Sequence, residues 1–362
     1  MPVESPCIKV PKKSGAKAID LAAHLNLLNR DLRVSSEGEH LCVPLLNKPT
    51  GVDAEKIVTV LPESKITTRD FHKRSKYPPT AIDLAKELLP RNLIDFFPSS
   101  MDFVGDIAIV EVPSQLEVCK KTLGEIILRS HRKVRTVLAK AGAIGGARRL
   151  RRFELLAGQD GTETVHREHG CIYYLDVAKV YFSPRLSFEH NRVASQVVEG
   201  ETVIDMFAGI GPFSILIAKK HAEVRVYAID LNPEAVDYLK RNIIANHVQG
   251  KVLPIIGDAK EVVPSRLGKS ADRVIMNLPE RAVDFLSPAC DALKPGGGII
   301  HLYHFESGPN PIETAKKKLA ETVERIGYKI ENVLLARVVR EVSPYRYQVV
   351  LDVGIAGHAI QG

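Results

Sequence analysis

Residues 203–215, with the sequence VIDMFAGIGPFSI, constrain the fold of this chain more than any other stretch. An apolar run ends at Asp205, and Gly209 and Gly211 then allow the sharp turn that brings a backbone close to a ligand. The apolar segment at 213–218 has the character of a helix. This order predicts a strand, a nucleotide-binding loop and the start of a helix. The glycine pair alone is weak evidence, because short glycine motifs also serve simply to turn a chain.

Further apolar runs follow at intervals typical of strands, at residues 224–229, 252–256, 273–276 and 298–303. The first three are followed by polar residues, namely Asp230, Asp258 and Asn277. Because the carboxyl ends of parallel strands meet at one edge, we predict an α/β fold with a Rossmann-like sheet and a ligand at its switch point. Residues 333–337 and 347–353 predict a terminal antiparallel hairpin, which methyltransferase sheets carry and all-parallel dehydrogenase sheets lack.

The chemistry of the loops favours a cationic ligand over a dinucleotide. The third position of a dinucleotide fingerprint should be Gly or Ala, and here it is Ser214. Asp205 would also place its charge where a pyrophosphate should sit. S-adenosylmethionine fits better, because its ammonium and sulfonium suit Asp205, its ribose diol suits Asp230 and its adenine amino group suits Asp258. The alternative is that these acids only cap loops.

The overall composition describes a globular protein with two or three domains, since the chain has 362 residues and is 45% hydrophobic. No window approaches the apolar length of a membrane span, and the first residues lack the regions of a signal peptide. The five cysteines are scattered without a CxxC pair, which is typical of reduced thiols. We therefore expect a cytoplasmic, monomeric protein with no membrane association and no metal site.

The net charge of +7 is concentrated in one segment, residues 129–152, which contains many Lys and Arg residues and no acid. A solvated surface is one interpretation of such a segment, and binding of nucleic-acid phosphates is the favoured one. The candidate RNA-binding residues are Arg132, Lys133, Arg135, Arg148, Arg151 and, further along the chain, Arg185.

Three domains are predicted. Residues 1–62 form a small N-terminal module, with strands at 7–10 and 41–45 and an amphipathic helix at 14–28. Residues 63–176 form a middle RNA-binding domain, with a strand at 104–112, a helix at 115–128 and a hairpin whose strands flank His169 and Gly170. Residues 177–362 form the catalytic domain, and a helix begins there near Glu189.

Several short motifs together resemble one known family. They are RLR at 149–151, LAG at 156–158, HREHG at 166–170, AKVYFSPRL at 178–186, DMFAG at 205–209 and MNLP at 276–279. They resemble the class I tRNA (guanine-37-N1)-methyltransferases of archaea and eukaryotes, in the three-domain archaeal form, over nearly the whole chain. The resemblance implies methyl transfer from S-adenosylmethionine to N1 of guanosine 37. It also implies a middle domain that grips the anticodon stem-loop and an N-terminal domain that checks the tRNA body.

The motif after Asn277 departs from that of methyltransferases acting on exocyclic base amines. Those enzymes have Asn-Pro-Pro followed by an aromatic residue, whereas this chain has Leu278, Pro279 and Glu280. Without an aromatic residue at position 280, a flipped base must stack elsewhere, and the candidates are Tyr181 and Phe182. Burial between domains is an equally open interpretation of Phe182. Exocyclic-amine chemistry is therefore disfavoured.

Methylation of guanine N1 needs a base to remove the N1 proton and a group to stabilise charge on O6. The resemblance assigns the base to Glu189 and the O6 contact to Arg149, and guanidinium groups do pair with guanine O6. The alternative for Glu189 is an acid that only stabilises a helix N-terminus. Asn277 and Tyr181 complete the predicted catalytic set. The predicted cofactor contacts are His190, Asp205, Phe207, Gly209, Asp230, Leu231, Asp258, Ala259, Asn277 and Pro279.

Other function classes stay open. A methyltransferase acting on a wyosine-type guanine derivative of tRNA would keep the same cofactor site. An NAD-dependent oxidoreductase is disfavoured by Asp205 and Ser214, and a catalytically silent RNA-binding protein by the joint presence of Glu189, Asn277 and Asp230.

Overall fold

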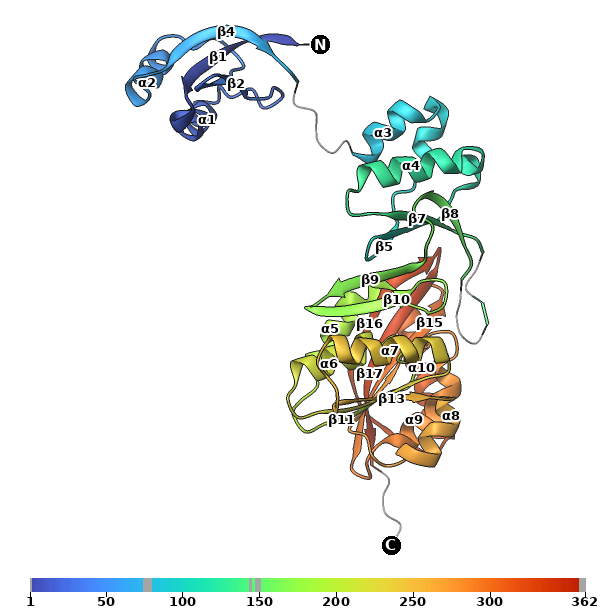
Figure 1. Ribbon diagram of the computed structural model, residues 1–362. Coiled ribbons are helices and arrows are strands. Elements are labelled where there is room, and N and C mark those ends of the chain that lie inside the picture. Colours follow the sequence, from blue (N-terminus) through green and yellow to red (C-terminus); the bar gives the residue numbers. More distant parts are fainter. Residues whose placement is uncertain (1, 74–79, 143–144, 147–150, 358–362) are drawn as a thin grey trace. The chain divides into compact units, whose positions relative to one another are not determined.

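The computed structural model describes residues 2–73, 80–142, 145–146 and 151–357 (Figure 1). The chain forms two compact units. The first comprises Met1–Leu88 with Arg129–His131, and the second comprises Leu89–Leu128 with Arg132–Gly362. Among the described residues, no helix has the length and apolar character needed to cross a membrane.

The first unit contains a four-stranded sheet in the order β2-β3-β1-β4. Its elements are β1 (Val3–Pro11), α1 (Gly15–His24), β2 (Ser35–Glu37), β3 (His40–Pro44), α2 (Val52–Val60), β4 (Lys65–Phe71) and α3 (Ala81–Leu88). The predicted strands and helix are present, but the helix ends at His24, just before Asn26 adopts a left-handed φ of 54°. Since β4 pairs with β1, this sheet continues past the expected boundary at residue 62.

The N-terminal part of the second unit contains a four-stranded sheet in the order β5-β6-β7-β8. Its elements are β5 (Asp102–Val104), β6 (Ile107–Val110), α4 (Lys120–Ser130), β7 (Thr136–Lys140) and β8 (Phe153–Gly158). The single strand predicted over 104–112 is wrong, because the chain turns at Gly105, which has φ +58°. A Cβ at Gly105 would lie 2.1 Å from the Thr164 hydroxyl, so both its conformation and its neighbour require glycine.

The predicted hairpin is present as β9 (Glu163–Glu168) and β10 (Cys171–Asp176). His169 and Gly170 both have positive φ, as the tight turns that connect such strands require. Two buried asparagines hold the hairpin. Asn242 of α7 (Pro233–Ala245) and Asn246, the residue after this helix, accept hydrogen bonds from the backbone N–H groups of Tyr174 and Ile172 at 2.7 and 2.9 Å. The hairpin therefore packs against α7, although the sequence predicted that it belongs to the middle domain.

The large sheet has seven strands in the order β13-β12-β11-β14-β15-β17-β16 (Figure 1). The strands are β11 (Thr202–Asp205), β12 (Arg225–Asp230), β13 (Val252–Ile256), β14 (Arg273–Met276), β15 (Gly297–Ser307), β16 (Ile330–Ser343) and β17 (Arg346–Ala356). The first five are parallel, and β17 runs antiparallel between β15 and β16. The predicted parallel sheet and terminal hairpin are confirmed.

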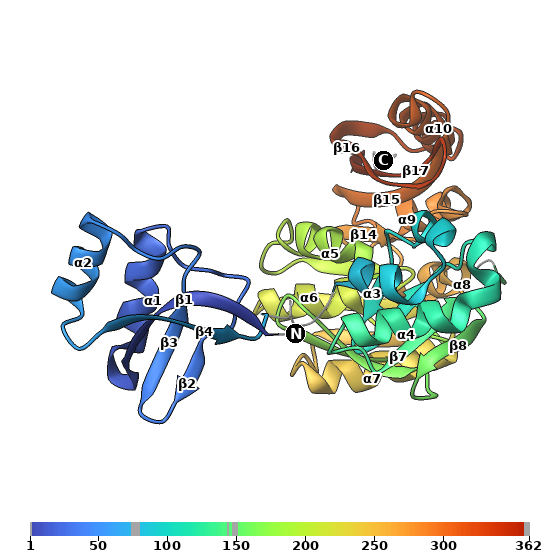
Figure 2. The same ribbon diagram turned by 90° about the horizontal axis from the view of Figure 1, so that it is seen from above.

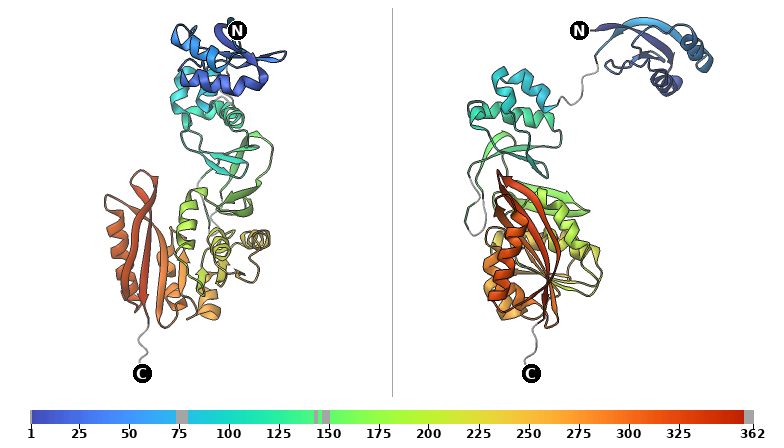
Figure 3. Two further views of the ribbon diagram at one scale, coloured as in Figure 1. Left: turned by 90° about the vertical axis from the view of Figure 1, so that its left-hand side faces the viewer. Right: turned by 180° about the vertical axis from the view of Figure 1, so that it is seen from behind.

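Helices cover both faces of the large sheet (Figures 2 and 3). They are α5 (Ser187–Ala194), α6 (Pro212–Lys220), α7 (Pro233–Ala245), α8 (Ala259–Val262), α9 (Leu286–Ala292) and α10 (Pro311–Arg325). Val203 belongs to the core beneath α5, α6 and α7, and its neighbour Ile204 belongs to the core beneath α8, α9 and α10. Because successive strand residues face opposite sides, a strand buried on both faces has adjacent apolar residues, as Val203 and Ile204 of β11 are.

Candidate active site

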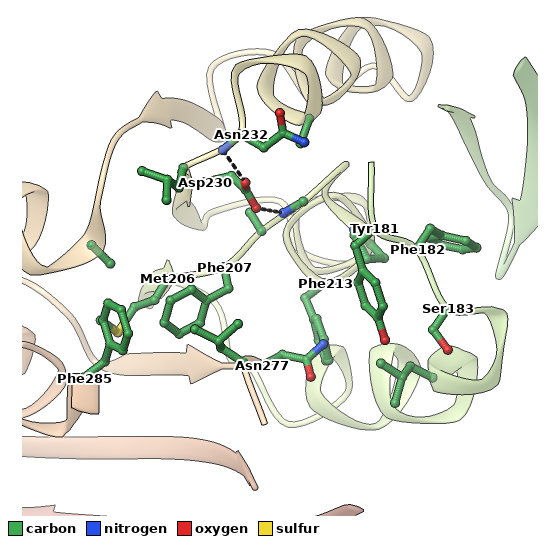
Figure 4. Close-up of a pocket in the computed structure, with 18 of the residues that line it drawn as sticks. Tyr181, Phe182, Ser183, Met206, Phe207, Phe213, Asp230, Asn232, Asn277 and Phe285 are labelled. Atoms are coloured by element: carbon green, nitrogen blue, oxygen red, sulfur yellow. Dashed lines mark hydrogen bonds between the residues drawn. The ribbon is translucent and has the colours of Figure 1, made fainter. Parts of the chain in front are cut away.

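A cavity of about 1000 Å³ lies at the carboxyl ends of β11, β12, β13 and β14 (Figure 4). Gly211 begins α6 with a left-handed φ of 91°, so the loop after β11 turns tightly beside this edge. Most of the residues predicted to contact the cofactor line the cavity. They are His190, Phe207, Gly209, Asp230, Leu231, Asp258, Ala259 and Asn277, and the predicted catalytic residue Tyr181 also lines it.

Asp230 holds two loops of the cavity together. Its carboxylate accepts the backbone N–H of Gly209 at 2.7 Å and that of Asn232 at 2.8 Å (Figure 4). Burial raises the pKa of this carboxyl group. Asp258 has a similar second role, because it caps α8 by accepting the N–H of Lys260 at 2.8 Å. Both acids therefore organise loops and line the cavity, so the two interpretations of the sequence are compatible.

Asp205 and Pro279 do not line the cavity, contrary to the sequence prediction. The side chain of Asp205 is fully buried and accepts a hydrogen bond from the Ser214 hydroxyl at 2.8 Å. Burial raises the pKa of this carboxyl to about 7. Asp205 therefore supports the glycine loop from inside. The carbonyl of Pro279 accepts the N–H of Phe305 at 3.1 Å, which fixes the loop after β14 to β15.

Asn277 presents an unsatisfied acceptor to the cavity. Its Oδ1 is buried without a hydrogen-bond partner among the residues that the structure describes. A buried acceptor of this kind normally has a partner, so a bound molecule with a donor group would satisfy it. Met206, Phe207 and Phe285 form an apolar wall nearby, with the Phe207 and Phe285 rings edge to face at 4.9 Å (Figure 4). The cavity thus combines carboxylates, an amide and an apolar wall.

A buried carboxylate holds His190 in place at the margin of the cavity. Nδ1 of His190 lies 2.6 Å from Oε1 of Glu168, and His166 lies within 3.7 Å of the same carboxylate. Burial alone would raise the pKa of Glu168, but the adjacent His166 and His190 hold it at about 2. The sequence analysis did not identify Glu168 as part of the site, although it lies within the HREHG motif.

The two aromatic candidates for base stacking have different surroundings. The Phe182 ring lies 5.0 Å from His166, 6.3 Å from Tyr173 and 6.5 Å from His190, and it is partly buried against the core. Tyr181 lines both the cavity and a second, adjoining cleft. Phe182 lines the same two depressions, so both aromatic residues stay candidates for stacking on a base.

Glu189, the predicted general base, begins α5 but lies beneath the surface, with 1% of its area exposed, and does not line the cavity. Its Oε2 accepts the Tyr303 hydroxyl at 2.7 Å and Nε of Arg192 at 2.9 Å. Its Oε1 forms an ion pair with Arg337. Tyr303 and Arg337 were missed from the sequence because they lie on distant strands and within no recognisable motif.

Models of known protein families match most of the chain. The model of the TRM5/TYW2 methyltransferase domain matches residues 164–332, that of the TYW2 N-terminal domain residues 82–161, and that of the tRNA methyltransferase 5 N-terminal domain residues 7–53. Trm5b of Pyrococcus abyssi, a tRNA (guanine(37)-N(1))-methyltransferase, is 38% identical across 95% of this chain and 97% of its own length. The chain belongs to the Trm5 family. The predicted family and fold class are confirmed.

Solved structures of the Trm5 and TYW2 proteins share this fold. The complex of aTrm5 and tRNALeu superimposes with a TM-score of 0.74 at 32% identity, over 96% of this chain and 99% of the other. The structure of M. jannaschii TYW2 in complex with AdoMet superimposes with a TM-score of 0.55 at 31% identity. This match covers 71% of this chain and 100% of the other. Among sequences, the tRNA 4-demethylwyosine(37)-methyltransferase Taw21 of Saccharolobus solfataricus is 40% identical over 70% of this chain and 92% of its own length.

A cleft with several basic side chains lies beside the cofactor cavity of this Trm5-family chain. It has a volume of about 1540 Å³ and shares Tyr181, Phe182 and Ser183 with the cavity. Its basic lining residues are Lys140, Arg151, Arg185, Arg340 and Arg346. Arg340 and Arg346 come from the terminal hairpin and were not predicted, since they lie outside the basic segment at 129–152.

The other candidate RNA-binding residues have varied surroundings. Nε of Arg185 donates to Asp102 at 2.5 Å, so this residue links the loop before α5 to β5. Lys133 and Arg135 line a third depression, where Arg135 pairs with Asp106 at 3.1 Å. Arg132 precedes these two residues in the loop between α4 and β7. Arg148 and Arg149 lie outside the described residues.

Within the described parts of the chain, no group of three or more His, Cys, Asp or Glu residues could hold a metal ion.

Proposed function

We propose that this protein transfers a methyl group from S-adenosylmethionine to N1 of guanosine 37 in tRNA, next to the anticodon. The observation that carries the proposal is the junction at Tyr181, where a cavity with carboxylate and amide groups meets a basic cleft. A methyl donor in the cavity and a nucleotide in the cleft would meet there. The predicted activity and cofactor agree with the names and contents of the relatives described above.

The residues of the cavity fit S-adenosylmethionine. The unpaired acceptor of Asn277 suits a donor on the ligand, and Asp230 and Asp258 suit its diol and amino groups. Leu231 and Ala259 adjoin these two acids in the lining, and Phe207 supplies part of the apolar wall. S-adenosylmethionine would supply an electrophilic methyl group on its sulfonium. The residues of the chain must then orient the guanine, exclude water and accept the N1 proton.

Glu189 is the residue that we assign to accepting the N1 proton. Its carboxylate lies between the guanidinium groups of Arg192 and Arg337, which favour the ionised form that a general base needs. Tyr181 would stack on the guanine, and Arg149 would stabilise the charge that develops on O6. Methyl transfer to N1 therefore requires a proton acceptor as well as the methyl donor.

The three parts of the chain would have separate tasks. We assign recognition of the tRNA body to the N-terminal module, binding of the anticodon stem-loop to the middle domain and its basic residues, and chemistry to the large sheet. We expect the protein to act as a monomer in the cytoplasm.

A methyltransferase acting on 4-demethylwyosine is the second candidate, because Taw21 shares 40% identity with this chain. The alignment with Taw21 covers 70% of the chain, whereas that with Trm5b covers 95%. The match of residues 7–53 to the Trm5 N-terminal domain also favours the first candidate.

Nucleoside mass spectrometry distinguishes the two candidates. An unmodified tRNA transcript incubated with the protein and S-adenosylmethionine should yield 1-methylguanosine, and the same transcript with adenosine at position 37 should yield none. Methylation confined to tRNA that carries 4-demethylwyosine would reject the first candidate and support the second.

A further inference from the structure

The two arginines that pair with Glu189 are held in different ways. Arg192 is 12% exposed in its side chain, and Arg337 is 32% exposed. Both contact the same carboxylate, with Arg192 on Oε2 and Arg337 on Oε1. The groups facing Glu189 are thus Arg192 from α5, Tyr303 from β15 and Arg337 from β16, while Asp352 of β17 lies behind Arg192.

Arg192 is fixed by a buried chain of polar groups. It pairs with Asp352, whose Oδ1 lies 2.7 Å from Nδ1 of His301, and Nε2 of His301 lies 2.8 Å from Nη1 of Arg273. Arg273 in turn donates to Glu201 at 2.9 Å. Burial lowers the pKa of His301, so a neutral ring that donates to Asp352 and accepts from Arg273 fits this order. Moving Arg192 would leave buried charges without partners, which is costly.

Arg337 has no comparable anchor in the described part of the chain. Besides Glu189, its guanidinium lies 5.0 Å from the centre of the Phe188 ring and makes a 3.4 Å contact with the carbonyl of Val338. Phe188 is itself 66% exposed. Arg337 lies on β16, an edge strand of the large sheet, and the register of β16 shifts on both sides of this residue. The same strand carries Arg340 into the basic cleft.

We propose that Arg337 is a releasable counter-ion of Glu189 that moves to a tRNA phosphate when the substrate docks. This inference rests on the proposed role of Glu189 as the general base. In the free protein, Arg337 pairs with Oε1 of Glu189, the oxygen that would otherwise accept a proton. Its departure leaves Glu189 with Arg192 and Tyr303 as partners, and the loss of one cation makes the carboxylate a stronger base.

The released oxygen can then take part in methyl transfer. The N1 proton passes to Oε1 of Glu189, and the N1 electron pair forms the bond to the methyl carbon. The carbon–sulfur bond breaks with its electrons remaining on sulfur, which yields S-adenosylhomocysteine. The proton affinity of the Glu189 carboxylate thus rises only when the guanosine is in place.

Binding of an unmethylated tRNA transcript, measured with S-adenosylhomocysteine so that no turnover occurs, tests this proposal. Glu189→Gln removes the anion that competes for Arg337, so tRNA should bind about two- to fivefold more tightly, the range expected from a partly exposed ion pair. Arg337→Gln should reduce the slope of log affinity against log salt by about 0.7 to 0.9, corresponding to one phosphate contact. The double variant should bind like Arg337→Gln alone, and Arg337→Lys should retain the slope.

Arg340→Gln is the matched control on the same strand. It should also reduce the salt slope, but Glu189→Gln should still tighten binding in its background. The proposal would be overturned if Glu189→Gln left the affinity for tRNA unchanged. It would also be overturned if Glu189→Gln changed that affinity equally in the wild-type and Arg337→Gln backgrounds. Failure of the catalytic assignment has a separate signature, since Glu189→Gln would then methylate tRNA at the wild-type rate whatever the binding cycle shows.

Discussion

Asp230 in the cofactor cavity and Glu189 beside it are both buried acids, but different kinds of donor hold them. Asp230 accepts hydrogen bonds from two backbone N–H groups of its own loops. Glu189 accepts hydrogen bonds from a phenol and one guanidinium group, and it forms an ion pair with a second guanidinium group on a long side chain. Backbone donors move only with their loops, whereas a guanidinium on an exposed strand can leave. The first arrangement suits recognition of a ligand, and the second suits a group that must change its proton affinity.

The largest effect should come from Glu189→Gln, which keeps the shape of the side chain but removes the proton acceptor. Single-turnover methyl transfer at saturating tRNA should fall by about 10²- to 10⁴-fold. Binding of S-adenosylmethionine should persist, because Glu189 does not line the cavity. A variant that also lost cofactor binding would show that Glu189 supports the cavity structurally.

Next in size is Asp230→Asn, which should weaken binding of S-adenosylmethionine. Hydrogen bonds to charged groups contribute about 1.5–3 kcal/mol, so we expect roughly a 10- to 100-fold higher dissociation constant by calorimetry. Asp237→Asn on the exposed side of α7 is the control, since Asp237 pairs only with Lys240 among the described residues. Equal affinities for the two variants would show that Asp230 serves the loops and not the ligand.

A smaller effect is expected for Arg346→Gln in the basic cleft. Removal of one phosphate contact should reduce the salt slope of tRNA binding by about 0.7 to 0.9, with no change in S-adenosylmethionine binding. The slope is obtained from affinities at several salt concentrations. An unchanged slope would exclude Arg346 from the RNA-binding surface.

The smallest effect on ligand binding should come from Asp205→Asn, because this residue lies beneath the loop and not in the cavity. Its effect should appear in stability. Burial raises the pKa of Asp205 from 3.8 to about 7, so the folded state binds more protons than the unfolded state between these values. The contribution of Asp205 to stability therefore decreases as pH rises from about 4 to 7. Thermal melts from pH 4 to 8 should show a weaker loss of stability with pH in the variant.

The cavity was largely predictable because each of its loops follows a strand that ends in a polar residue. Gly209, Asp230, Asp258 and Asn277 take their places from the order of the strands, which the apolar runs reveal. Asp205 shows where this reasoning fails. It ends β11 like the others, but its side chain is directed into the protein, where Ser214 is its partner. Successive residues of a strand point to opposite faces of the sheet, so a shift of one position moves a side chain from one face to the other.

The surroundings of Glu189 could not be predicted in the same way. Tyr303, Arg337 and Asp352 lie on β15, β16 and β17, more than a hundred residues beyond α5 in the chain. Arg337 occupies a strand whose register shifts repeatedly, so its side of the sheet does not follow from alternation. The role of Gly105 was also hidden, because the apolar residues around it continue the pattern of one strand across the turn.

The pH dependence of single-turnover methyl transfer, compared between the wild-type protein and Glu189→Gln at saturating tRNA and S-adenosylmethionine, tests most directly whether Glu189 removes the N1 proton. The wild-type rate should rise with pH as the base loses its proton and then reach a plateau. The variant should be slower at every pH and should lack this rise. If Glu189→Gln retains the wild-type rate and the same rise across the range, Glu189 is not the base and another group or water removes the N1 proton.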